Sequence, residues 1–221
     1  NIAGASDGEV EELKEFQERV YSEVDRIVTE LEIEHNEKGH RADSYLYCME
    51  TICPECGWKV PLAPSWVIGK GTKTIAILKD NGIDGFDIDI KSNVSKEDMK
   101  NSDSYITVRG NNMYCPHCEM ETPITSIRRD RKSENGETIY GLRHWEKNEF
   151  IPRENDVFQE RLYCVRYVSK NGRYYIKPTE EDLKREEKVV DLLSERFSEW
   201  QELGYIPSAR IEAGYNTTQP I

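Results

Sequence analysis

The chain has 221 residues and a mass of 25.7 kDa, enough for one large or two small domains with a sizeable hydrophobic core. No run approaches about 18 apolar residues, so the sequence predicts no membrane span, and six cysteines without an apolar leader argue against a secreted, disulfide-based scaffold. The net charge of −12 is unevenly distributed along the chain. Residues 1–35 carry 11 acidic and 3 basic side chains, residues 179–203 carry 9 acidic and 4 basic side chains, and residues 36–178 are close to neutral. The net charge therefore does not exclude nucleic-acid binding by residues 36–178.

The first predicted element is an amphipathic helix over residues 8–34. Its apolar residues recur at spacings of three and four with charged residues between them, which is the helical pattern. Such a helix has one face that another surface must cover. Residues 35–44 are polar and contain a glycine, so they predict a loop. We place an N-terminal acidic helix and loop at 1–44. The apolar residues of the helix are Val10, Leu13, Phe16, Val20, Val24, Ile27, Val28 and Leu31.

Residues 45–178 form a predicted β-rich region. Short runs of β-branched and aromatic residues alternate there with Gly, Asn and Asp. Residues 86–90 alternate strictly, so Asp87 and Asp89 should face outward. Asn171-Gly172 between two aromatic runs is a strong hairpin signal. The clearest predicted strands are residues 45–52, 73–78, 86–90, 105–109, 122–127, 161–168 and 173–176.

Two Cys-Pro-x-Cys turns lie within this region. They supply Cys53 and Cys56, then Cys115 and Cys118, and we interpret them as the halves of one four-thiolate zinc site. Each turn presents two thiolates to a tetrahedral ion, and four cysteines leave no open position for water or substrate. The sequence therefore predicts a structural zinc ion that stabilises the fold.

The two turns are not identical. Gly57 follows the first turn, where a tight turn often needs a residue without a Cβ, but Glu119 follows the second. The 58 residues between Cys56 and Cys115 are also more than a compact zinc ribbon usually has. We therefore expect a β-rich excursion inserted between the turns.

Other interpretations of the cysteines remain open. Each pair could be a redox dithiol, although no thioredoxin-like βαβ pattern surrounds either one. His117 could replace a cysteine as a ligand. Cys48 and Cys164 lie in apolar and aromatic runs and are most simply small buried core residues.

The last predicted element is a second acidic helix. Thr179 is its expected N-cap, acidic residues fill its first turn, and Gly204 is its expected stop. The tail after Gly204 has no regular period and resembles a connector. We place the C-terminal helix and connector tail at 179–221. The missing initiator Met and this tail lead us to expect a fragment of a longer protein. The two acidic helices should pack on each other or on a neighbouring domain.

Two segments are candidates for DNA contact. The first is a basic cluster after the second Cys-Pro-x-Cys turn, whose long side chains could reach phosphates; the alternative is a solvated hairpin end. The second mixes bases with aromatic residues over 143–161, which suits an unstacked base or a phosphate backbone; the alternative is a loop that its aromatic residues pin to the core. Trp58, Trp66 and Trp200 are expected packing residues. The candidate DNA-contact residues are Arg128, Arg129, Arg131 and Lys132, and then Arg143, Trp145 and Lys147.

Taken in order, these features resemble the prokaryotic adenine-specific DNA methylases that contain a zinc ribbon. The resemblance spans most of the chain, although each piece is short. It comprises the acidic helix before Tyr45-Leu46-Tyr47, the Cys-Pro-x-Cys-Gly turn, Lys59-Val60-Pro61-Leu62 with Ser65-Trp66, the runs Lys73–Lys79 and Phe86–Lys91, Arg109-Gly110-Asn111 ahead of the second Cys-Pro-x-Cys, residues 175–183 and Gly204-Tyr205-Ile206-Pro207.

The resemblance implies a larger enzyme than this chain. Such methylases transfer a methyl group from S-adenosylmethionine to the exocyclic amine of adenine, using an Asp/Asn-Pro-Pro-Tyr loop and a glycine-rich cofactor loop. This chain has no Pro-Pro dipeptide, and Gly69-Lys70-Gly71 and Asn81-Gly82 lack a parallel βαβ context. The resemblance therefore implies a zinc-ribbon insert without catalytic residues, with S-adenosylmethionine bound only by the parent protein.

We therefore expect an α+β fold in which a zinc-ribbon-centred antiparallel β middle is flanked by an N-terminal and a C-terminal amphipathic helix. The expected role is DNA contact or target recognition for a DNA adenine methyltransferase in the cytoplasm. The expected partners are DNA and the catalytic domain of the same parent chain. We expect no contact with a membrane. The alternative is a structural zinc module that mediates protein-protein or inter-domain contacts without touching DNA.

Overall fold

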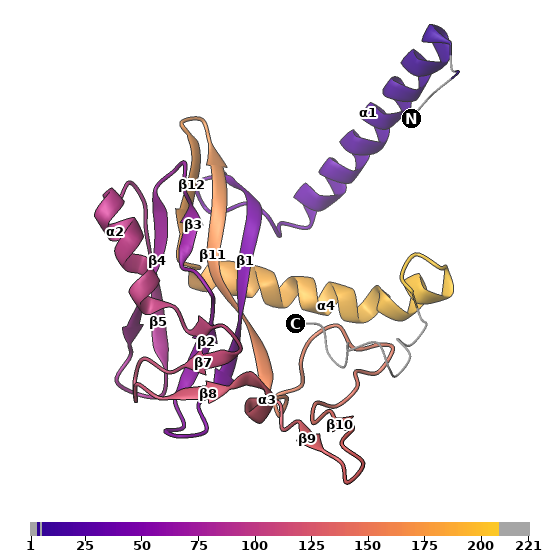
Figure 1. The fold of residues 1–221 in the computed structure, drawn as a ribbon. Coiled ribbons are helices and arrows are strands. Elements are labelled where there is room, and N and C mark those ends of the chain that lie inside the picture. The colour runs from indigo at the N-terminus through magenta and orange to yellow at the C-terminus, as the bar shows by residue number, and fades with distance from the viewer. Residues whose placement is uncertain (1–3, 5, 208–221) are drawn as a thin grey trace.

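The computed structural model describes residue 4 and residues 6–207, apart from the side chain of Asp103. Within this part the fold combines helices with antiparallel sheets, as the sequence predicts (Figure 1). The strands and three short helical segments form one body, helix α4 runs out from it, and helix α1 projects away from it. No helix in the described part is long and apolar enough to cross a membrane.

Helix α1 spans Asp7–Glu30 and stands apart from the body. Ser6 caps it: the Ser6 hydroxyl accepts from the Glu9 amide, while the Glu9 carboxylate accepts from the Ser6 amide at 2.8 Å. The helix ends four residues before the predicted limit, and Glu32 adopts a φ of 54° that no helix can continue. None of its residues is buried, so the predicted apolar face exists but is uncovered among the described residues.

The largest sheet has the strand order β12-β11-β1-β2, all antiparallel. Its strands are β1 (Arg41–Ile52), β2 (Lys59–Leu62), β11 (Phe158–Ser169) and β12 (Gly172–Ile176). Strand β1 begins four residues earlier than the sequence predicts, because Arg41 and Ala42 pair with the end of β11. The predicted hairpin at Asn171-Gly172 is confirmed as the turn between β11 and β12.

Smaller sheets form the excursion between the two cysteine turns. One contains β3 (Val67–Gly69), β4 (Thr74–Asp80) and β5 (Phe86–Lys91), followed by α2 (Lys96–Asn101) and the 3-10 helix η1 (Ser102–Tyr105). Another contains β6 (Val108–Arg109), β7 (Asn112–Tyr114) and β8 (Glu121–Pro123). After β8 come α3 (Ile124–Ile127) and the hairpin of β9 (Arg131–Lys132) with β10 (Thr138–Ile139).

Two predicted strands are partly wrong. Residues 105–109 give a strand only at Val108–Arg109, because Tyr105 ends η1 and residues 106 and 107 belong to no regular element. Residues 122–127 stop being a strand at Pro123, which has no N–H for a sheet, and then turn into α3, whose Ile127 is buried in the core. In both cases tertiary packing overrides the β propensity of the local residues.

The core lies between the largest sheet and the β3-β4-β5 sheet. Trp66 is 1% exposed, and its indole N–H donates to the Tyr105 carbonyl at 2.8 Å. The ring of Tyr163 meets it edge-on. Cys48 and Cys164 are both buried, which confirms them as core residues outside the four-cysteine group.

Helix α4 spans Glu180–Glu202 and is anchored to the sheet by a buried polar group. Thr179 caps the helix as predicted, and Asp182, 2% exposed, completes the capping box. The Asp182 carboxylate also accepts from the Tyr167 hydroxyl of β11 and from Arg185 at 2.6 Å. The predicted stop is confirmed, because Gly204 adopts a φ of 77° just beyond the helix. Helices α1 and α4 diverge (Figure 1), so they do not cover each other's apolar faces.

Candidate metal centre and basic groove

The two Cys-Pro-x-Cys segments form turns with the same backbone hydrogen bonds. In the first, which joins β1 to β2, the Cys53 carbonyl accepts from the Gly57 amide at 2.8 Å. In the second, which joins β7 to β8, the Cys115 carbonyl accepts from the Glu119 amide at 2.8 Å. The excursion therefore leaves the first turn and returns to place the second one opposite it.

The four cysteine sulfurs form one cluster that could hold a metal ion. All lie within 4.8 Å of one another, with Sγ–Sγ distances of 3.8 Å between Cys53 and Cys118 and 3.7 Å between Cys56 and Cys115. A tetrahedral zinc ion with bonds of about 2.3 Å requires ligand sulfurs about 3.8 Å apart. Cys53 and Cys115 are completely buried. The spacing thus fits a closed tetrahedral site.

Hydrogen bonds favour the thiolate at Cys118, whereas burial favours the thiol at Cys56 and Cys115. Burial raises the pKa of the Cys56 and Cys115 thiols. Burial also acts against the Cys118 thiolate, but hydrogen bonds from the Met120 amide and from the neighbouring thiols lower its pKa overall. A buried thiolate that accepts backbone N–H bonds is the form that binds a metal ion.

An aromatic stack joins the two cysteine turns. The Trp58 and His117 rings are parallel, 6° apart in orientation, with centroids 3.8 Å apart. His117 Nδ1 lies 2.7 Å from the Asp80 carboxylate at the end of β4, and the Trp58 indole donates to the Gly85 carbonyl at 3.0 Å. The stack therefore ties both turns to the β4-β5 hairpin. His117 is not among the clustered ligands.

From the sequence, Trp58 was expected only to be a packing residue and His117 only to be an alternative ligand. Trp58 follows Gly57 directly, so the sequence places it beside the first cysteine turn. Nothing in the sequence indicates that Trp58 stacks on His117, which lies 59 positions further along the chain. Asp80 was not singled out at all.

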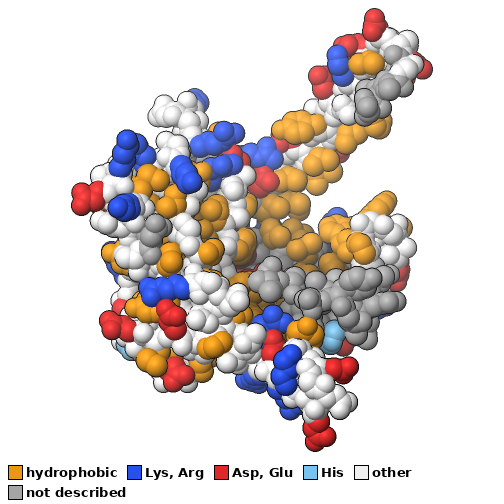
Figure 2. Space-filling view, in the orientation of Figure 1, with side chains coloured by type: hydrophobic (Ala, Val, Ile, Leu, Met, Phe, Trp, Pro, Cys, Tyr) orange, Lys and Arg blue, Asp and Glu red, His pale blue; other side chains and the backbone are white. Residues whose placement is uncertain are grey.

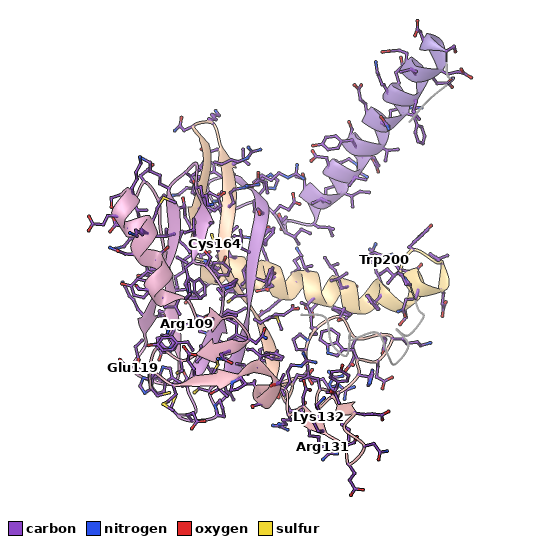
Figure 3. All side chains as sticks on the ribbon, viewed as in Figure 1. Arg109, Glu119, Arg131, Lys132, Cys164 and Trp200 are labelled. Atoms are coloured by element: carbon purple, nitrogen blue, oxygen red, sulfur yellow. The ribbon has the colours of Figure 1, made fainter. Side chains whose placement is uncertain are left out.

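Glu119 is the strained residue of the second turn. Its φ is 61°, matching the 78° of Gly57 at the same place in the first turn, and its side chain is exposed (Figure 3). The left-handed conformation costs an L-residue about 1–2 kcal/mol, and a glycine there removes this strain. The new glycine also lowers the free energy of unfolding by about 0.4–1 kcal/mol, because it increases the conformational entropy of the unfolded chain. We expect Glu119→Gly to raise the free energy of unfolding by about 0.5–1 kcal/mol, measured by urea denaturation.

Gly57→Ala is the matched control for this change. No atom lies within 4 Å of the added methyl, so its cost is conformational alone, and we expect a loss of about 1 kcal/mol. A destabilised Glu119→Gly protein with an unchanged metal content would contradict the strain argument.

The predicted basic cluster is split between two grooves. Arg128, Arg131 and Lys132 line one groove of about 570 Å³, together with Tyr140. Arg129 lines another of about 490 Å³, beside the first cysteine turn. Arg131 and Lys132 are exposed on β9, and Figure 3 shows them on the β9-β10 hairpin, which projects from the lower side of the body in this view.

The wall of the first groove is fixed by close backbone packing. A β-carbon on Gly141 would lie 2.3 Å from the Arg128 carbonyl oxygen and 2.4 Å from that of Arg129. Only glycine allows this approach. Arg128 itself is mostly covered and lies 3.4 Å from the Asp130 carboxylate, so Arg131 and Lys132 offer most of the free positive charge of the groove.

The second predicted segment has an intramolecular role. Arg143 binds Asp156 through two hydrogen bonds of 2.6 and 2.5 Å and binds Glu149 at 2.6 Å. These carboxylates raise the pKa of the Arg143 guanidinium. Trp145 is partly buried beside it, and the Lys147 carbonyl accepts from Gln201 of α4 at 2.5 Å. The contacts match the alternative of a pinned loop, and the guanidinium of Arg143 is already occupied.

Comparisons of the chain with protein-family models, with curated proteins and with solved structures gave no match.

Proposed function

We propose that this chain is a zinc-stabilised DNA-contact region of an adenine-specific DNA methyltransferase. The zinc part rests on the sulfur cluster, whose Sγ–Sγ distances of 3.7 and 3.8 Å suit a tetrahedral ion with four thiolate ligands. The methyltransferase part rests on the ordered sequence motifs that resemble the zinc-ribbon methylases. The zinc ion supplies structural stability when bound, and methyl transfer belongs to the parent protein.

The observation that carries DNA contact is the groove lined by Arg128, Arg131 and Lys132. In the chain, these three residues follow the second cysteine turn, from which β8 and α3 separate them. A metal-fixed turn followed by exposed cations suits phosphate contact, because long basic side chains on a rigid support set the register of a protein on DNA. A methylase must also extrude its target base, so extra grip on the duplex is useful.

The test is DNA binding by the 221-residue chain. We expect it to bind a short fluorescein-labelled duplex with an affinity that falls steeply between about 50 and 200 mM salt, because phosphate contacts release counterions. Changing Arg131 and Lys132, the two exposed cations of this groove, together to alanine should weaken binding at least about tenfold. If the folded, metal-loaded protein does not bind the duplex at low salt, the result contradicts the DNA role.

The methylase assignment has a separate test in the gene. We expect its reading frame to encode an Asp/Asn-Pro-Pro-Tyr loop and a glycine-rich cofactor loop beside this segment, and the resulting protein to methylate adenine. A reading frame without these loops contradicts the methylase assignment, and the zinc and DNA tests remain independent of it.

A specific observation also favours the alternative of a protein-interaction module. In α1 the apolar side chains stay open to solvent, with Phe16 and Val24 each 53% exposed and Val20 47% exposed. A helix gains most of its stability in proteins from a covered apolar face. Two results together would favour this alternative. The chain would bind a partner domain and lose this binding when Val20 and Val24 are changed to serine, and the unmodified chain would not bind DNA.

A further inference from the structure

A basic surface that the sequence analysis did not single out lies at one end of the body. Three segments meet there: residues 69–73 between β3 and β4, residues 91–100 after β5, and residues 169–173 between β11 and β12. We call this surface the lysine end. Together the segments carry seven basic and two acidic side chains. Figure 2 shows Lys and Arg side chains gathered over this end of the strands.

Backbone and hydroxyl contacts join the first two segments, and the third belongs to the neighbouring sheet. The Asn93 amide donates to the Thr72 carbonyl at 3.3 Å, and the Thr74 and Ser92 hydroxyls are 3.0 Å apart. A β-carbon on Gly69 would lie 3.6 Å from the hydroxyl of Tyr175 on β12, so the β3-β4 turn lies against that strand. The lysine end therefore lies along two sheets that pack together through β5 and β12.

The cations of the lysine end are available for a ligand. Lys70, Lys73, Lys91 and Lys170 are exposed, and none forms an ion pair with any residue that the structure describes. Among the carboxylates of this region, Glu97 is exposed, Asp98 is hydrogen-bonded to Ser95 in the cap of α2, and Asp43 pairs with Arg166 and Arg173. The acidic helix α1 projects away from this end of the strands.

The chemistry of the lysine end suits phosphates along a nucleic-acid backbone. Its lysines stand among exposed hydroxyl and amide side chains, those of Thr72, Ser92, Asn93 and Asn171, which are the groups that contact DNA phosphates and sugars. None of the three segments carries an exposed large apolar residue. A membrane-binding surface usually inserts such residues, so the polar composition favours a soluble polyanion.

We propose that the lysine end is a second DNA-contact surface, which holds the phosphate backbone of the duplex through Lys70, Lys73 and Lys170. This assignment rests on the proposed function, in which the chain contacts DNA. Contacts between lysines and phosphates fix the register of a duplex without reading its sequence, so we expect this surface to position the duplex.

The experiment compares the unmodified chain with two charge-matched variants by fluorescence anisotropy, using a short labelled duplex. The test protein carries Lys70→Gln, Lys73→Gln and Lys170→Gln. The control carries Lys14→Gln, Lys184→Gln and Lys188→Gln on the two acidic helices, which removes the same charge elsewhere. We expect the test protein to bind at least about tenfold more weakly and to lose about 2–3 from the slope of log affinity against log salt, while the control changes little.

The outcomes separate this proposal from the proposed function. If the unmodified chain binds DNA and the test protein binds like the control, the lysine end is not a contact surface, although the DNA role stands. If the unmodified chain binds no DNA, both proposals fall. Binding through the same lysines to vesicles of phosphatidylcholine and phosphatidylserine, but not to DNA, overturns the proposal in favour of a lipid surface.

Discussion

Replacing Cys53 or Cys115 by serine is expected to abolish metal binding and to unfold the region around the two cysteine turns. Both thiols are completely buried, and each belongs to a different turn, so either change breaks the connection between β1-β2 and β7-β8. Structural zinc contributes about 10–16 kcal/mol of apparent binding free energy in zinc-finger peptides, more than the whole stability of many domains. Metal analysis of the purified protein should show one zinc ion per unmodified chain and none in the variants.

The chain supplies its own controls for this experiment. Cys48 and Cys164 are also buried cysteines but lie outside the cluster. We expect Cys48→Ala and Cys164→Ala to keep one zinc ion per chain and to lose only the stability of a small core cavity. Hydrogen exchange should locate the opened region in β2 and β6–β8. A Cys53→Ser protein that keeps its full metal content would show that the ligand set is wrong.

The second large effect is expected at Asp182, which anchors α4. Its carboxylate is buried and bonded to Tyr167, Thr179 and Arg185, and Arg185 is only 13% exposed at its side chain. Removing one member of a buried charged group leaves the others unpaired and costs about 3–5 kcal/mol. We expect Asp182→Ala to lower the free energy of unfolding by that amount, measured by urea denaturation at neutral pH.

The same site should make stability depend on pH. Burial acts to raise the pKa of Asp182, but the hydrogen bonds from Tyr167, Thr179 and Arg185 outweigh it and hold the pKa below its ordinary value. The contribution is therefore fully present above the unfolded pKa of about 3.9 and is lost as the pH falls through the lower folded pKa. The difference between the unmodified protein and Asp182→Ala should shrink in that acidic range.

Glu181→Ala is the matched control for the anchor. Glu181 is one position away and pairs with Lys184, but both side chains are largely exposed, at 47% and 65%. Exposed pairs contribute little, so we expect a change within about 0.5 kcal/mol and no added pH dependence. An Asp182→Ala protein as stable as this control would mean that α4 is held by its apolar contacts alone.

Local chemistry in the sequence was enough to locate several features. Thr179 and Gly204 define both ends of α4, because a capping side chain and a left-handed glycine act on their immediate neighbours. The Asn-Gly hairpin follows from the same kind of local preference. The four cysteines could also be grouped in advance, because each turn fixes the spacing of two ligands by itself.

Features that depend on distant contacts could not be obtained in this way. The strand expected over residues 122–127 ends at Pro123, and residues 124–127 form helix α3, which buries Ile127 in the body. Arg143 looked available for DNA until the fold brought Asp156 and Glu149 to its guanidinium. The lysine end could not be predicted because its three segments are far apart in the chain and belong to two different sheets, which come together only by packing.

By itself, the sequence determined the pairs of cysteine ligands, the capped acidic helices and the α+β character, since these depend on residues a few positions apart. Only the tertiary structure decided that the four sulfurs meet, which cations remain free and that α1 is uncovered. The physical reason is that metal geometry, ion pairing and burial act between residues close in space, whose distances in the chain carry no such information.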